Sequence, residues 1–89
     1  MFRLWCKLYD DDGRLLKDRV EENSEDTNRT RKVLDAVRNA CREFDLAEPI
    51  WFDANIRDFK AHSKTRFRID NFVESVPFEY MEIQVIEED

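Results

Sequence analysis

This 89-residue chain has three thiol or imidazole side chains, which can act as a nucleophile, a general base or a soft metal ligand: Cys6, Cys41 and His62. A cysteine nucleophile needs an accessible thiol that a neighbouring base activates. Both cysteines fall on apolar faces of predicted elements, so we expect protonated core thiols rather than a disulfide. A structural zinc site needs about four such ligands, so these three residues alone cannot form one. We predict no catalytic residue, metal or cofactor, and the enzymatic alternative is His62 acting with a neighbouring carboxylate.

A basic stretch between residues 57 and 68 is the strongest candidate for a binding site. Its basic side chains are Arg57, Lys60, His62, Lys64, Arg66 and Arg68. A short helix over 54–62 followed by a strand over 65–69 would bring them to one surface that binds phosphate or carboxylate. The alternative is a solvated face whose cations pair across the sheet with Glu79 or Glu82.

Aromatic residues mark a second candidate surface near the N-terminus. Trp5 and Tyr9 share a predicted strand face with Arg3 and Lys7, and mixtures of aromatic residues and arginine are typical of interaction surfaces. The helix or the second half of the chain could instead cover this face. Trp51, beside the basic stretch, could stack on a nucleic-acid base, although a tryptophan between two apolar residues is more often part of the core.

The aspartates Asp10–Asp12 come directly before the one glycine of the chain, Gly13, and suggest a calcium-binding loop. An EF-hand loop needs oxygen ligands at alternate positions before its glycine and a glutamate six residues after it. Alignment on Gly13 places Leu8 at the first ligand position and Arg19 at the last. The motif therefore fails, and we predict a solvated hairpin turn.

Hydrophobic periodicity predicts the elements that position these side chains. Residues 2–9 alternate as a strand, and residues 14–22 form its hairpin partner across the turn. An apolar stripe at helical spacing predicts a long helix over 25–45, with Ser24 as its cap. The remaining predicted elements are a short strand at 50–52, a short helix at 54–62, and strands at 65–69 and 78–87, the last with a bulge or a face switch near Met81.

This order of elements predicts a single α+β domain over residues 1–89. Its expected architecture is an antiparallel sheet of about four strands, with one long helix packed on it and a short second helix. One glycine is too few for a phosphate-binding loop or a dinucleotide fingerprint. These patterns give a fold class and leave the activity open.

Charge narrows the classes of partner. The net charge of −6 opposes non-specific binding of nucleic acid and docking on anionic membranes. Residues 46–69 are the exception, because their five basic and three acidic side chains give +2. No apolar run approaches the roughly 20 residues of a membrane span, and two cysteines without a secretory signal favour the reducing cytoplasm.

Two segments of the chain resemble a known group of proteins. The run AEPIWFDANIRDFKAHSKTRF, residues 47–67, and the ending EYMEIQVIEED resemble small bacterial proteins of about this length whose function is unknown. The resemblance implies an intracellular bacterial protein and supplies no activity, cofactor or site residue. We therefore expect a non-enzymatic binding or interaction module, whose partner is another protein or a second copy of the chain, with nucleic acid disfavoured.

Overall fold

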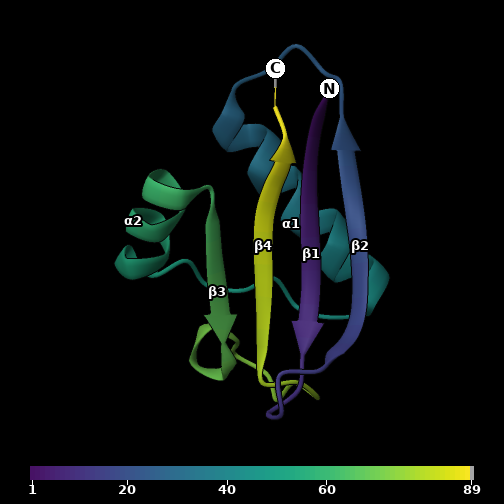
Figure 1. Ribbon diagram of the computed structural model, residues 1–89, viewed down its shortest axis with the longest axis vertical. Coiled ribbons are helices and arrows are strands. Elements are labelled where there is room, and N and C mark those ends of the chain that lie inside the picture. The colour runs from purple at the N-terminus through teal and green to yellow at the C-terminus, as the bar shows by residue number, and fades with distance from the viewer. Residues whose placement is uncertain (89) are drawn as a thin grey trace.

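The computed structural model describes residues 1–88 and has the predicted α+β architecture. In chain order the elements are β1 (Phe2–Tyr9), β2 (Leu15–Asn23), α1 (Arg29–Phe44), α2 (Asp53–His62), β3 (Lys64–Arg68), the 3₁₀ turn η1 (Ile69–Asn71) and β4 (Tyr80–Glu87). The four strands form one sheet in the order β2-β1-β4-β3, and every neighbouring pair is antiparallel (Figure 1). The first and last strands of the chain therefore pair at the centre of the sheet.

The β1–β2 hairpin follows the predicted alternation and turn chemistry. Gly13 has a φ of 79°, which a residue without a side chain adopts at little cost. The Asp10 carboxylate accepts hydrogen bonds from the backbone N–H groups of Asp12 at 3.0 Å and Arg14 at 2.8 Å. These bonds fix the turn that carries the chain from β1 into β2.

The long helix forms because its apolar residues share one face, and it begins later than predicted. Asn28, not Ser24, caps α1: its side-chain oxygen accepts a hydrogen bond from the N–H of Arg31 at 2.8 Å. The helix ends where Asp45 takes a left-handed conformation at a φ of 60°. Its buried face consists of Val33, Ala36, Val37, Ala40 and Cys41.

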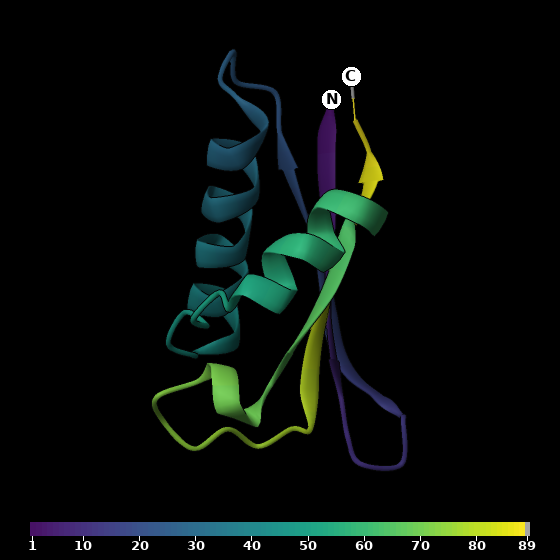
Figure 2. The same cartoon turned by 90° about the vertical axis from the view of Figure 1, so that its left-hand side faces the viewer.

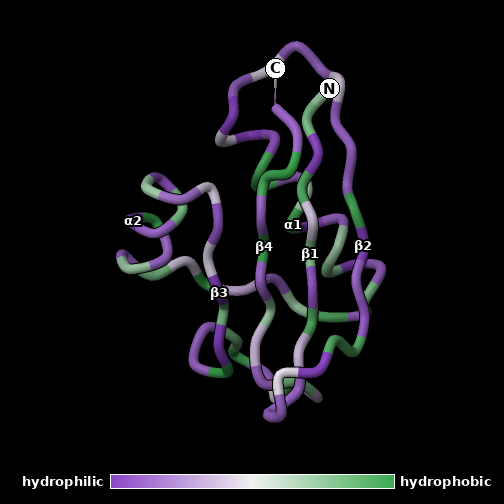
Figure 3. Tube along the Cα trace, viewed as in Figure 1, coloured by the Kyte–Doolittle hydropathy of each residue, from purple (hydrophilic) through white to green (hydrophobic). Residues whose placement is uncertain are grey.

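The core lies between α1 and one face of the sheet. Alternate residues of β1 are buried on that face (Phe2, Leu4, Cys6 and Leu8), and Met81 and Ile83 of β4 lie beside them. Hydrophobic and hydrophilic residues alternate along these central strands (Figure 3). Seen edge-on, α1 lies to one side of the sheet, and α2 runs diagonally past its β3 edge (Figure 2). The opposite face carries no helix from the described residues. Neither helix has the length and hydropathy that a membrane span requires.

Two local predictions were wrong. The apolar run at residues 50–52 is not a strand: it leads into α2, and Ile50 is 47% exposed while Trp51 packs against the core. The bulge in the last strand lies near its end rather than at Met81, because Arg3 pairs with Glu87 while Leu4 pairs with Val85. The extra residue, Ile86, separates the buried alternation of β4 from its exposed end.

Candidate functional site

A cleft of about 450 Å³ lies between α2 and the outer edge of β3. It contains four of the six residues of the predicted basic patch: His62, Lys64, Arg66 and Arg68. The other residues around it are Phe52, Ala54, Asn55, Asp58, Thr65 and Asn71. Arg57 and Lys60 lie on α2 but do not line this cleft. The structure therefore brings together the strand half of the predicted patch and the end of the helix.

Strand geometry explains why the cations of β3 gather on one side. Thr65 and Phe67 are buried, whereas Lys64, Arg66 and Arg68 are exposed. Successive side chains of a strand point to opposite faces. The three cationic residues are therefore held two apart along a single strand. The alternation predicts this for Arg66 and Arg68, whereas the predicted strand begins at residue 65 and leaves Lys64 in the connection before it.

Two buried asparagines form the wall between α2 and β3. The Asn55 amide donates to Thr65 Oγ1 at 3.0 Å and to the carbonyl of Arg66 at 2.9 Å. The Asn71 amide donates to Asn55 Oδ1 at 2.8 Å, and its oxygen accepts from the N–H of Arg68 at 3.0 Å. These bonds cover backbone groups on the outer edge of β3, where an unpaired strand edge would otherwise attract another chain.

Sequence reasoning missed both asparagines. For Asn55 a local signal exists. It is the third residue of α2, and its side-chain oxygen accepts from the N–H of Phe52, the residue before the helix, at 3.0 Å. A polar side chain at the third position of a helix commonly caps the helix start in this way. Asn71 has the same kind of local signal at the start of η1, where its oxygen accepts from the N–H of Arg68, three residues earlier. Its bonds to Asn55 and Ile50 have no local signal. Its role depends on the pairing of segments far apart in the sequence.

Arg66 is held by the sheet. Its Nε donates to Glu82 at 2.9 Å, and the Lys7 ammonium lies 2.9 Å from the other oxygen of the same carboxylate. Burial alone would raise the pKa of Glu82, but the hydrogen bonds from Lys7 and Arg66 outweigh it and hold this pKa below its ordinary value. The cross-strand pairing that the sequence suggested for the basic strand is therefore present at Arg66, with Glu82 and not Glu79 as its partner.

The other cations of the cleft have no such partner. Within residues 1–88, neither Lys64 nor Arg68 is within ion-pair distance of a carboxylate. Arg68 lies opposite Tyr80, with its guanidinium carbon 5.7 Å from the ring centroid. Among the described residues that line the cleft, Asp58 is the one with an acidic side chain. The cleft therefore offers two uncompensated cations to an anion.

The second predicted surface lies on the helix-free face of the sheet. Tyr9 stacks on Tyr80 with ring centroids 5.0 Å apart, and Trp5 donates from Nε1 to Asp18 at 2.9 Å. The Lys7 ammonium lies 4.0 Å from the centre of a Trp5 ring. No helix of the described chain covers this face. The partial burial of Trp5 and Tyr9 therefore comes from neighbouring side chains of the sheet.

Trp51 belongs to the core side of the molecule. Its ring meets Phe59 edge-on at 5.7 Å and Phe67 at 4.9 Å between centroids. Of the two predicted roles, core packing is the one that these contacts support.

The cysteines have the character of core residues. Cys6 and Cys41 are both free and buried. Burial raises the pKa of the Cys6 thiol to about 12, with a smaller contribution from the nearby Cys41, and burial likewise raises the pKa of Cys41 to about 12. Neither thiol has the accessible, ionised character of a nucleophile.

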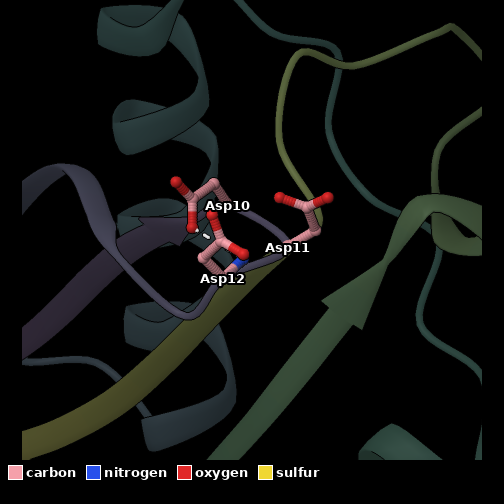
Figure 4. Close-up of side chains that lie close together, drawn as sticks. All are labelled: Asp10, Asp11 and Asp12. Carbon is pink, nitrogen blue, oxygen red and sulfur yellow. Dashed lines mark hydrogen bonds between the residues drawn. The ribbon is translucent and has the colours of Figure 1, made fainter.

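The three turn aspartates lie close together (Figure 4). One carboxylate oxygen from each of Asp10, Asp11 and Asp12 lies within 4.8 Å of those of the others. Two of the hydrogen bonds that define the turn end on Asp10. The cluster is thus accounted for as turn chemistry, as the failed EF-hand spacing indicated.

Comparison with known proteins adds no assignment: no family model, no curated protein and no solved structure matches this chain. Any function must therefore be argued from the cleft and the sheet themselves.

Proposed function

We propose that this protein is a non-enzymatic binding module that holds an anionic ligand in the cleft between α2 and β3. The observation that carries the proposal is the pair Lys64 and Arg68, which line the cleft without a carboxylate partner in the described chain. Arginine supplies paired donors that fit a carboxylate or a phosphate, and lysine adds a point charge. His62 also lines the cleft.

The wall of the cleft supports this role. Asn55 and Asn71 hold the edge of β3 against α2, so the cations stand on a framework that is already formed. A preformed site loses less conformational entropy when it binds. Two free, buried cysteines support placing the module in a reducing compartment such as a bacterial cytoplasm.

The test is an amide NMR titration of labelled protein with inorganic pyrophosphate and with an end-blocked polyglutamate peptide, at low and raised salt. We expect shifts centred on residues 62–68 that shrink as salt screens the charges. The variants Lys64→Glu and Arg68→Glu should remove these shifts. Arg57→Glu is the matched control, because it makes the same change of charge on α2 outside the cleft. A spectrum that neither anion perturbs would refute the proposal.

A second candidate function rests on a different observation: Asp58 and His62 are four residues apart on α2 and both line the cleft. A carboxylate and an imidazole in one cleft are the components of a general acid–base pair. If the protein were a small enzyme of this kind, His62→Ala would abolish turnover and leave affinity intact. In a binding module the same change should weaken binding modestly, as loss of one cation does.

A further inference from the structure

Exposed apolar residues lie beside the cationic cleft. Ile50, Phe52 and Ile69 are 47%, 42% and 53% exposed, respectively. The segment before α2 is held against η1 by two hydrogen bonds, from Ile50 N to the Asn71 carbonyl at 2.6 Å and from the Asn71 amide to the Ile50 carbonyl at 2.7 Å. Phe52 itself lines the cleft. Exposed apolar side chains therefore lie on the segments that flank the cleft, and hydrogen bonds hold these segments in place.

Neighbouring side chains engage the aromatic rings of the helix-free face, which disfavours their use as a platform for nucleic-acid bases. Tyr80 is stacked on Tyr9, and the guanidinium carbon of Arg66 lies 4.7 Å from its ring centroid. Lys7 occupies a face of Trp5. Stacking of a base needs a free ring face. Binding of the nucleic-acid backbone needs an excess of basic side chains, whereas the net charge of the chain is −6. Both observations disfavour nucleic acid as the partner.

From the adjoining charges and apolar side chains we infer that the anion bound in the cleft is an acidic segment of another protein that also carries an apolar side chain. Its carboxylates would pair with Lys64 and Arg68, and its apolar residue would pack against Phe52 and Ile69. This inference rests on the proposed function and adds the class of partner. Complementary charge sets the orientation of such a contact, and buried apolar area supplies most of its affinity.

The inference is tested with three probes of equal charge: an end-blocked polyglutamate peptide with a central serine, the same peptide with a central phenylalanine, and a single-stranded thymidine oligonucleotide. Dissociation constants from amide NMR titrations at low salt should rank the phenylalanine peptide tightest. Burial of one aromatic side chain predicts about a tenfold difference between the two peptides.

Substitutions separate the two parts of the site. Phe52→Ala and Ile69→Ser should remove the advantage of the phenylalanine peptide and leave the serine peptide unaffected, whereas Lys64→Glu should weaken both. Leu16→Ser is the matched control, because Leu16 is 47% exposed on β2, far across the sheet order from β3. Each variant changes an exposed residue, and its folded state is checked by its own amide spectrum.

The outcomes distinguish the inference from the proposed function. If both peptides bind equally at the cleft, the anion site stands and the acidic-apolar partner is wrong. If the oligonucleotide binds more tightly than either peptide, the partner class is nucleic acid and the inference is overturned. If none of the three probes binds but pyrophosphate does, the anion site stands and the acidic-apolar partner is wrong. If pyrophosphate also leaves the spectrum unchanged, the proposed function itself fails.

Discussion

At the scale of single residues, the buried carboxylate of Glu82 is the counter-charge for Lys7 and Arg66 on the helix-free face. Both Lys7 and Glu82 have side chains only 8% exposed, 2.9 Å apart, and Arg66 completes the cluster. Replacement of Glu82 by Ala leaves a buried ammonium without its counter-charge, which should lower the free energy of unfolding by about 3 kcal/mol. Urea unfolding measures this loss. Glu79→Ala, at an exposed position, is the control and should change stability by less than about 0.5 kcal/mol.

The same carboxylate should make the free energy of unfolding depend on pH. The pKa of Glu82 in the folded protein lies below its ordinary value of 4.5. The stability it contributes is therefore fully present above pH 4.5 and is lost as the pH falls through the lower folded pKa. The stability difference between the wild type and Glu82→Gln should be constant near neutrality and shrink below pH 4.5. A difference that stays constant down to pH 2 would contradict this assignment.

Cys6 and Cys41 should be chemically silent while the protein is folded. Burial raises both thiol pKa values to about 12, so thiolate is scarce at pH 8 and reagents have no access. We expect no modification by iodoacetamide at pH 8 in native buffer and modification of both cysteines in urea, read by mass spectrometry. Rapid labelling of either cysteine in the native protein would show that it is accessible.

At the scale of elements, Asn55 joins α2 to the edge of β3. Asn55→Ala leaves the Arg66 carbonyl and the Phe52 N–H without their side-chain partners, which should cost about 2–3 kcal/mol. Hydrogen exchange should accelerate in α2 and β3 before it does so in β1. Asn39→Ala on the exposed side of α1 is the matched control. Uniform acceleration across the sheet would mean that Asn55 supports the whole fold rather than this junction.

The elements show what the sequence could predict and what it could not. Periodicity located the four strands of the sheet and one strand, at 50–52, that does not form. Alternation reports on burial in β1 and β3, whereas β2 is largely exposed. The start of α1 was misplaced because several residues before it can cap a helix, and only tertiary contacts select Asn28. The sequence predicts that a cationic strand contributes to the site. It does not predict which of the cations lack a carboxylate partner. Which of them Glu82 neutralises depends on the register between β3 and β4.

At the scale of the whole molecule, the position of β4 makes folding depend on the end of the chain. The strand order β2-β1-β4-β3 places the last strand between the first and third, and Met81 and Ile83 of β4 are fully buried. A chain that ends at Pro77 would leave β3 without a partner strand and expose the central edge of β1. We expect that chain to lack a cooperative thermal transition and dispersed amide signals.

Removal of residues 87–89 is the matched truncation. It takes away the exposed end of β4, including the 2.6 Å ion pair between Glu88 and Arg29, and leaves the buried part of the strand in place. Such exposed pairs contribute about 0–1 kcal/mol, so this chain should fold with nearly the stability of the full protein.

Pairing of β1 with β4 closes almost the whole chain into one loop, which should also place folding in the slow range of two-state domains. A cooperative transition in the chain that ends at Pro77 would mean that the β1–β2 hairpin and α1 form a folding unit without β4.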